Sequence, residues 1–249
     1  MKYIFIAGCP RSGTSALTEL LSSSDEIAIG MERFKYAYKD KNINESFFSK
    51  DSFFKFSDSQ TNINMSQGKY VKYYDKLKLK YDSTTIRGDK YPMIYKFYNS
   101  LTNSFTQKPT FIFIYRDLYD VADSFNVRAE NPKDSWPKEN NYKKAVFHWN
   151  DSIVKTLQAL NSGVDILVIK YEALFDATAD LASYNIERII SHLDIKKTDD
   201  LKNTHSKMME EYAEKVKPKL RNLSEEGKLY LDENMDRTTL YEIEKFSKI

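Results

Sequence analysis

The strongest constraint on the fold lies at the start of the chain. A short apolar run, 3–8, leads into the turn-forming residues Cys-Pro-Arg-Ser-Gly-Thr-Ser, and an apolar helical pattern follows at once with Leu17, Leu20 and Leu21. This order predicts a strand, a tight loop and the N-terminus of a helix. Such a junction presents backbone N–H groups and the positive end of a helix dipole to a bound phosphate. The chain therefore begins with a predicted phosphate-binding loop.

The loop departs from the ATP-binding Walker A pattern, G-x-x-x-x-G-K-[ST], at one position. Gly8, Gly13 and Ser15 fit the spacing, but Thr14 stands where the lysine is expected. That lysine reaches the β- and γ-phosphates of a nucleoside triphosphate. The loop is therefore predicted to hold a phosphate group other than the γ-phosphate of ATP.

Composition favours a single domain over residues 1–249. No Pro/Gly/Ser-rich linker divides the chain, which is long enough to bury a full α/β core. The formal net charge of +2 argues against a nucleic-acid partner held by a large positive field. With Cys9 as the only cysteine, we expect neither a disulfide framework nor a cysteine-rich metal site. No signal-peptide pattern or membrane-length apolar run is present, which predicts a soluble cytoplasmic protein without a membrane partner.

Alternating patterns predict a parallel β-sheet with helices on both faces, the α/β class. Strands are expected at 3–8, 26–30, 111–115 and 165–170, with a weaker one near 84–87. Helices are expected at 14–23, 67–82, 118–130, 139–162 and 185–193, followed by a charged, mostly helical region at 206–248 that is broken near Pro218. Ligands of such sheets bind beyond the carboxyl ends of the strands, which is where the first loop lies.

The segment 33–66 interrupts this alternation. It carries six phenylalanines among Lys, Asp, Ser and Asn, without a clean period. Two interpretations stand: an irregular cover over an acceptor pocket, or a satellite core beneath a long loop. The aromatic residues Trp136 and Trp149 are expected to serve helix packing instead.

A second strand-to-helix transition follows at 111–124. Arg116 stands at the carboxyl end of the strand, and Ser124 and Arg128 are four residues apart on one face of the following helix. Two guanidinium groups and a hydroxyl that converge on one point suit a phosphate dianion. The alternative is a surface helix whose arginines form ordinary ion pairs with the aspartates nearby.

Two phosphate sites at the ends of two strands favour a nucleotide whose phosphates lie at separate positions. A nucleoside triphosphate needs one cradle and a magnesium site. The strand 111–115 ends in Arg116, and no acidic residue clearly fills the Walker B role. We therefore expect a nucleotide site without a metal.

At this point the sequence resembles the sulfotransferases that use 3′-phosphoadenosine 5′-phosphosulfate (PAPS). Residues 10–15 are similar to their 5′-phosphosulfate loop, and Arg116 with Ser124 to their 3′-phosphate motif. The segment 168–174, followed by 192–195, resembles the family's Y-E-x-L … F-L-x-I element, whose tyrosine contacts the cofactor. The resemblance implies a P-loop NTPase-like fold and PAPS as cofactor, with adenosine 3′,5′-bisphosphate as product.

A finer resemblance is to the tyrosylprotein sulfotransferase branch and related bacterial enzymes. In that branch a glutamate twenty-one residues after the loop arginine is the general base, and Glu32 has this spacing from Arg11. A second arginine twelve residues after the 3′-phosphate arginine is matched by Arg128. Lys90, within 87–92, resembles a Gly-Asp-Lys-x-Pro element of bacterial members. Glu32, Arg11 and Lys90 are thereby implied as catalytic residues.

The same resemblance implies a set of cofactor-binding residues and leaves several alternatives open. The implied set is Arg11, Ser12, Gly13, Thr14, Ser15, Arg116, Ser124, Arg128 and Tyr171. Glu32 has the alternative of a surface ion pair with Arg33 or Lys35. Asp89 is a second candidate base, with the alternative of a turn or cap residue before Tyr91 and Pro92. The family's C-terminal Arg-Lys-Gly cofactor loop is absent, and Arg221 or Lys219 is a candidate replacement.

The predicted reaction is an in-line transfer of a sulfuryl group to a hydroxyl, phenol or amine. The acceptor stays open among a small molecule, a saccharide, a lipid headgroup and a peptide tyrosine. Two other functions remain alternatives: a P-loop nucleotide kinase, against which Thr14 counts, and a non-catalytic nucleotide-binding protein.

Overall fold

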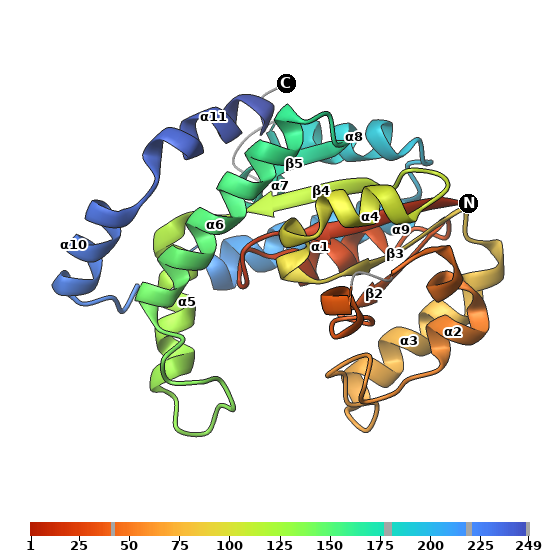
Figure 1. The fold of residues 1–249 in the computed structure, drawn as a ribbon, viewed down its shortest axis with the longest axis horizontal. Coiled ribbons are helices and arrows are strands. Elements are labelled where there is room, and N and C mark those ends of the chain that lie inside the picture. The colour runs from red at the N-terminus through yellow and green to blue at the C-terminus, as the bar shows by residue number, and fades with distance from the viewer. Residues whose placement is uncertain (41–42, 177–180, 218–220, 248–249) are drawn as a thin grey trace.

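The fold is built on one five-stranded parallel sheet with the order β2-β3-β1-β4-β5 (Figure 1). The computed structural model describes residues 1–249 except 41–42, 177–180, 218–220 and 248–249. The strands are β1 Lys2–Ala7, β2 Ile27–Met31, β3 Ile86–Lys90, β4 Thr110–Tyr115 and β5 Ile166–Lys170. All neighbouring strands pair in parallel, which confirms the predicted fold class.

The strand predicted near 84–87 is real, but it is central and lies further along the chain. β3 sits between β2 and β1 and ends at Lys90. Its sequence hides this position because Arg87, Asp89 and Lys90 are polar. Gly88 is required there, since a Cβ atom at this residue would lie 1.9 Å from the carbonyl oxygen of Ile4. The shift matters because it places Lys90 at the carboxyl end of a central strand.

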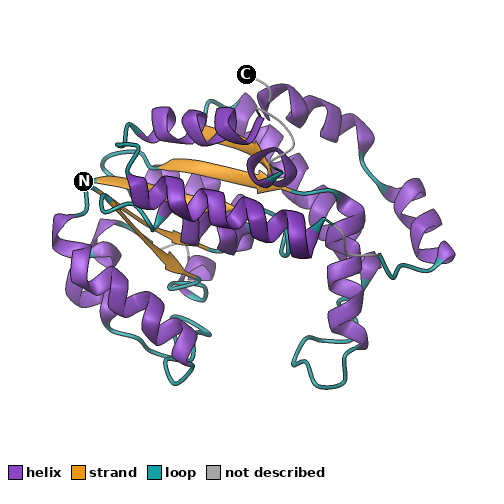
Figure 2. Cartoon of the chain, turned by 180° about the vertical axis from the view of Figure 1, so that it is seen from behind, coloured by secondary structure: helices purple, strands orange, loops and turns teal. Residues whose placement is uncertain are grey.

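The two faces of the sheet carry different cores, and helices cover both of them (Figure 2). One face is aliphatic, where Leu17 and Leu20 of α1 (Thr14–Leu21) meet isoleucines of the strands and of α8 (Leu181–Leu193). The other face is aromatic, where Phe5 and Phe111 pack with Trp149 of α6 (Tyr142–Asn161). Burying both faces in this way is the arrangement that parallel sheets require.

The main predicted helices are present, with shifted ends. They are α1 Thr14–Leu21, α3 Gly68–Lys80, α5 Leu118–Glu130, α6 Tyr142–Asn161 and α8 Leu181–Leu193. The predicted start of α6 at 139 is wrong because Asn141 caps the helix, its side chain accepting a hydrogen bond from the Lys143 N–H. The shorter elements are α2 Lys50–Phe54, α4 Tyr98–Ser104, α7 Tyr171–Phe175 and 3₁₀ turns at Ala37–Asp40, Glu45–Phe48, Tyr81–Ser83 and Pro92–Lys96.

The C-terminal region is helical in its described parts. α9 spans Asp199–Glu211 and continues as a π-helical turn, Tyr212–Val216, while α10 and α11 span Glu225–Asn234 and Arg237–Ser247. α10 and α11 form the arm that runs beside α6 in Figure 1. The expected break near Pro218, like Lys219, lies outside the described residues. In the described ranges no helix combines the length and apolarity needed to cross a bilayer.

The phenylalanines of 33–66 belong to the main core. Phe34, Phe48 and Phe53 are fully buried and join the aromatic cluster around Phe5. These three form part of the main core and no separate satellite core, whereas Phe47, Phe54 and Phe56 are partly buried and pack against it. The buried guanidinium of Arg33 bonds to the backbone of the segment.

Candidate functional site

A cavity of about 310 Å³ lies where β1, β3 and β4 end. Its lining residues are Pro10, Arg11, Gly13, Thr14, Ser15, Glu32, Lys90, Pro92, Arg116, Arg128, Trp136 and Tyr171. The three residues predicted as catalytic therefore face the same space as most of those predicted to hold a cofactor. Of the latter, Ser12 and Ser124 are the two outside the lining.

The first loop has the backbone geometry of a phosphate cradle. Arg11 and Gly13 have φ angles of 74° and 91°, so the chain turns sharply at both. A Cβ atom on Gly13 would lie 2.2 Å from the ring of Tyr171, so only glycine lets this ring approach the loop. Gly13 also caps α1 without a side chain, which leaves the first N–H groups of the helix to a ligand.

Ser12 lies inside the loop. Its side chain is fully buried, and its hydroxyl oxygen has no hydrogen-bond partner among the described residues. Its backbone N–H donates to the carbonyl of Cys9 at 3.0 Å and closes the turn. An unsatisfied buried hydroxyl is costly in a folded protein. Ser12 is therefore positioned to bond a group that enters the loop.

Three guanidinium groups converge on the cavity. The Nε of Arg11 donates to the hydroxyl of Ser124 at 2.9 Å, which explains how Ser124 belongs to the site. The guanidinium of Arg116 lies 4.7 Å from the ring centre of Tyr171, and that of Arg128 lies 4.4 Å from the ring centre of Trp136. Flat contacts of this kind fix the orientation of the cations.

The positively charged side chains around the cavity repel one another. Burial lowers the pKa of Arg11, and the charges of Arg128 and Arg116 lower it further. In addition, the Nε of Arg116 is buried without a hydrogen bond among the described residues. A cavity that gathers like charges at this density favours binding of an anion.

The alternative of ordinary ion pairs on α5 is partly right. Arg116 lies 3.3 Å from Asp120, and Arg128 makes two hydrogen bonds of 2.8 Å with Asp134. Both arginines nevertheless line the cavity. The carboxylates therefore partly neutralise the cations without removing them from the site.

Glu32 follows the last residue of β2 and lines the same cavity. Its φ of 55° is unusual for a residue other than glycine, and its N–H donates to the carbonyl of Lys90 at 2.6 Å. One carboxylate oxygen lies 3.3 Å from Nζ of Lys90 and the other 3.1 Å from Nζ of Lys35. Burial by itself raises the pKa of Glu32, but the charges of Lys90 and Lys35 outweigh it and leave the pKa below its usual value.

Asp89, the second candidate base, has a different place. It is fully buried, does not line the cavity, and accepts hydrogen bonds from the N–H groups of Arg33 and Phe34 and from the hydroxyl of Tyr38. Burial, opposed by these bonds, raises its pKa to about 6. Asp89 thus supports the turn that follows Glu32.

The family model of the sulfotransferase family matches residues 3–200 of this chain. The chain belongs to the sulfotransferase family. No curated protein matches the sequence. The match spans every residue that lines the cavity, so the cavity lies within the sulfotransferase region.

Solved sulfotransferases share the fold of this family member at low identity. The sulfotransferase domain from the curacin biosynthetic pathway is 15% identical with a TM-score of 0.53, and the alignment covers 93% of this chain and 96% of that one. The domain from the Synechococcus PCC 7002 olefin synthase is 17% identical with a TM-score of 0.53 and 94% coverage of both chains. Sulfotransferase STF1 from Mycobacterium tuberculosis H37Rv is 12% identical with a TM-score of 0.51, covering 82% of this chain and 70% of that one. At these identities the likeness establishes the fold.

Sequence reasoning missed several residues of this sulfotransferase site. Trp136 was expected to serve helix packing, and its ring does pack edge-to-face against Phe125 of α5, with 5.1 Å between ring centres, but it also lines the cavity and contacts the guanidinium of Arg128. Asp134, in the loop before α6, was not singled out. Arg221, one candidate for the absent C-terminal loop, bonds to Asp120 and Asp117 at the start of α5. The spacing of Asp134 and Trp136 from Arg128 carries no motif that could have revealed them.

Proposed function

We propose that this sulfotransferase moves the sulfuryl group of PAPS to a hydroxyl or amine acceptor. One observation carries the proposal: Arg11, Arg116, Arg128 and Lys90 line a single cavity at the ends of three strands. PAPS bears phosphate groups at its 5′ and 3′ positions, and the arginines stand at two strand-to-helix junctions. The site thus offers two anion-binding ends to a nucleotide that has two anionic ends.

The residues present fit this cofactor. The loop 10–15 would hold the 5′-phosphosulfate with the first N–H groups of α1 and the unpartnered hydroxyl of Ser12. Arg116, which lines the cavity and whose Nε lies 3.9 Å from a carboxylate oxygen of Glu172, would hold the 3′-phosphate with Arg128 and Ser124. Tyr171 would contact the nucleotide beside Gly13. Charge-assisted hydrogen bonds from guanidinium groups to phosphate are stronger than hydrogen bonds between neutral groups.

When bound, PAPS supplies an activated sulfuryl group. The acceptor oxygen forms a new bond to sulfur while the bond from sulfur to the 5′-phosphate oxygen breaks. Glu32 accepts the proton that the acceptor hydroxyl loses, so the products are the sulfate ester, adenosine 3′,5′-bisphosphate and a protonated carboxyl group. Arg11 and Lys90 stabilise the negative charge that grows on the leaving oxygen.

The state of Glu32 suits a proton acceptor. Because Lys90 and Lys35 hold its pKa below the usual range, the carboxylate is ionised near neutral pH. It can therefore accept a hydrogen bond from an incoming hydroxyl without first losing a proton. General-base catalysis of this kind contributes about 10²–10⁴-fold in rate.

The proposed organisation keeps residues 1–249 as one sulfotransferase domain. The segment 33–66 follows Glu32 directly and would cover the acceptor side, whereas the described residues of 206–248 lie outside the cavity lining. The acceptor is a small molecule, a saccharide or a peptide. The site is expected to work without a metal.

A thermal-shift experiment tests the cofactor proposal. Adenosine 3′,5′-bisphosphate at about 100 times its Kd should add about 2.7 kcal/mol to the free energy of unfolding without magnesium. For a chain of this size that corresponds to a rise in melting temperature of about 5–10 °C. Adenosine 5′-monophosphate is the control and should give a smaller rise, because it lacks the 3′-phosphate. Equal shifts from the two nucleotides would contradict the 3′-phosphate site, and magnesium-dependent stabilisation by ATP would favour a kinase instead.

A further inference from the structure

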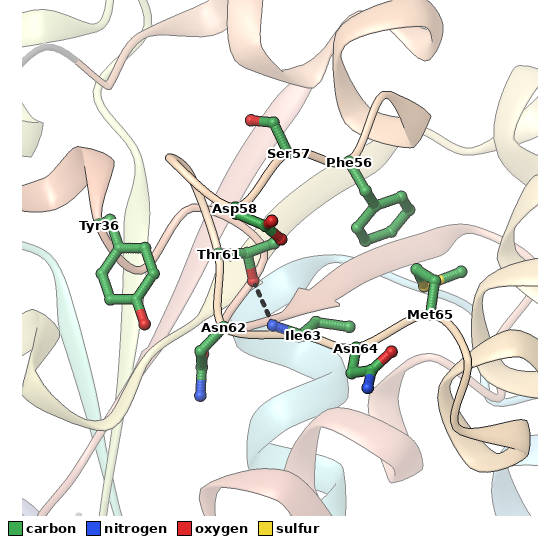
Figure 3. Close-up of a pocket in the computed structure, with 9 residues that line it drawn as sticks. All are labelled: Tyr36, Phe56, Ser57, Asp58, Thr61, Asn62, Ile63, Asn64 and Met65. Atoms are coloured by element: carbon green, nitrogen blue, oxygen red, sulfur yellow. Dashed lines mark hydrogen bonds between the residues drawn. The ribbon is translucent and has the colours of Figure 1, made fainter.

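A second cavity, of about 510 Å³, lies within the segment 33–66 (Figure 3). Tyr36 forms one side of it, and the loop from Phe56 to Met65 forms the other. Its size is in the range of small-molecule sites in proteins. This pocket is separate from the cavity that Glu32 lines, although it lies in the segment that follows Glu32.

Two hydrogen bonds connect this pocket to the backbone around Glu32. The hydroxyl of Thr61, which lines the pocket, donates to the carbonyl of Glu32 at 2.7 Å. The N–H of Tyr36 donates to the carbonyl of Gln60 at 3.0 Å, which joins the two sides of the pocket. Tyr36 itself is only four residues after Glu32. A molecule in the pocket would therefore lie against the backbone that carries Glu32, whose side chain lines the cavity of about 310 Å³.

The aromatic residues of the pocket are held in different ways. The ring of Phe56 packs against the guanidinium of Arg33 at 4.5 Å and edge-to-face against Tyr74 at 4.8 Å, so it is fixed. The ring of Tyr36 is 37% exposed and faces the pocket from the other side. Tyrosine combines apolar ring surface with a polar hydroxyl. The pocket thus offers apolar surface to the C–H groups of a bound molecule.

The polar groups of the pocket are mixed donors and acceptors. The Asn64 side-chain oxygen accepts from the N–H of Ser66 at 2.8 Å, which leaves its amide nitrogen free to donate. Asn62 is exposed and offers both its oxygen and its nitrogen. Asp58 is the one charged residue among the described residues of the lining. Such a set matches a molecule rich in hydroxyl groups and disfavours one that carries a carboxylate or sulfate.

A third cavity, of about 450 Å³ between α1, α3 and α9, has the opposite character. It is lined by Lys69, Lys72, Lys76 and Lys207 together with Glu19 and Glu211. This lysine groove would suit an anionic molecule. The pocket of Tyr36 has the stronger claim as an acceptor site because it is bonded to the backbone of Glu32.

We propose that the pocket of Tyr36, Phe56, Asp58 and Asn62 binds the sulfuryl acceptor, and that this acceptor is a saccharide without negative charge. The proposal rests on the sulfuryl transfer proposed above and names the substrate class for that site. Asp58 gives it a charge preference: an amino sugar is favoured over a neutral sugar, and a uronic acid is disfavoured.

Three acceptors of similar shape but different charge test the charge preference of the pocket. Sulfuryl transfer from PAPS is measured for p-nitrophenyl β-glucoside, its 2-amino analogue and the corresponding glucuronide. One unit charge a few ångströms from another in water changes the interaction by about fivefold in equilibrium terms. We therefore expect kcat/KM to fall by about fivefold at each step from amino sugar to glucoside to glucuronide.

The isosteric variant Asp58→Asn should remove these differences. It lowers kcat/KM for the amino sugar and raises it for the glucuronide, so that the values for the three acceptors converge. Asp51→Asn is the matched control, because Asp51 is exposed in the same segment but does not line the pocket. Unchanged preferences in Asp58→Asn would overturn the assignment of this pocket.

The contribution of the Tyr36 ring to acceptor binding is tested by measuring KM for the acceptor. Tyr36→Ala should raise KM for the glucoside about tenfold, as truncation of an anchoring aromatic does, and Tyr36→Phe should restore most of the affinity. The KM for PAPS should stay the same in both variants. Tyr241→Ala on α11 is the control for loss of an exposed ring.

The outcomes separate this proposal from the one it rests on. If adenosine 3′,5′-bisphosphate binds but the glucuronide is the best substrate, the acceptor site is the lysine groove and the proposal is wrong. If the nucleotide binds and none of the three glycosides is sulfated, the saccharide assignment is also wrong. Failure of nucleotide binding itself would instead contradict the sulfuryl transfer from PAPS.

Discussion

The proposed donor side and the proposed acceptor side of the site are built in different ways. The proposed donor side consists of the loop 10–15 and the segment from Arg116 to Arg128, which follow neighbouring strands. The proposed acceptor side consists of the single segment 33–66 that follows Glu32. Arginines are central to both, but Arg11, Arg116 and Arg128 line the main cavity and Arg33 does not.

On the acceptor side the central cation is already satisfied by the protein. Arg33 is fully buried, and its guanidinium donates to the carbonyls of Phe53 and Ser52 at 2.7 and 2.9 Å. On the donor side, the Nε of Arg116 is buried without a hydrogen bond among the described residues. A buried arginine thus stabilises the fold where carbonyls surround it, whereas Arg116, which faces the carboxylates of Asp120 and Glu172, also lines the cavity.

The largest expected effect concerns the residue between the two sides. Glu32→Gln keeps the size of the side chain and removes its ability to accept a proton. We expect kcat to fall by about 10²–10⁴-fold. Binding of adenosine 3′,5′-bisphosphate, measured by calorimetry, should remain, because the donor side is untouched. Glu233→Gln, on the exposed face of α10, is the control, and full activity in Glu32→Gln would show that another group takes the proton.

The variant Arg33→Met tests the acceptor side. It removes a buried charge and leaves backbone carbonyls of 52–55 without donors, which should lower the free energy of unfolding by about 3 kcal/mol. The melting temperature measured by calorimetry should therefore fall by about 6–12 °C. Lys39→Met, at an exposed position nearby, should change it little. If folded Arg33→Met also lost nucleotide affinity, the two sides would not be independent.

The variant Arg116→Ala tests the donor side through ligand affinity, whereas Arg33→Met tests the acceptor side through stability. Loss of a charged hydrogen-bond donor should weaken binding of adenosine 3′,5′-bisphosphate by about 10–100-fold. Affinity for adenosine 5′-monophosphate should change much less, because it lacks the 3′-phosphate. Arg237→Ala, on exposed α11, controls for the loss of a positive charge. Equal losses for both nucleotides would place Arg116 at the 5′ end.

The two sides also differ in how well the sequence predicts them. The residues of the donor loop are contiguous, and a strand-loop-helix order fixes where their backbone points. Arg116, Ser124 and Arg128 follow from the same logic at β4, since parallel strands bring their carboxyl ends together. The donor side could therefore be placed from the sequence before any contact was known.

The acceptor side could not be placed in this way. The polar residues of β3 conceal a central strand, because Asp89 and Lys90 are buried by partners that lie far away in the sequence. Arg33 looked like a surface partner of Glu32, yet it bonds to carbonyls about twenty residues further along. Trp136 similarly reaches the cavity from a loop without periodicity. Such contacts depend on tertiary packing, which no local pattern records.

The smallest predicted effect concerns the influence of Lys35, on the acceptor side, on the pKa of Glu32. The acid limb of the pH profile of kcat/KM reports the pKa of the free enzyme's base. Burial raises the pKa of Glu32, but Lys90 and Lys35 lower it more, so activity should persist as pH falls until it passes below the usual carboxyl range. Removing the charge of Lys35, which lies 3.1 Å from Glu32, leaves the burial effect less opposed. In Lys35→Met the acid limb should therefore move to higher pH, with kcat at neutral pH largely kept. The control variant Lys55→Met should leave the acid limb where it is. An acid limb that stays fixed or moves to lower pH in Lys35→Met would show that Glu32 is not the titrating base.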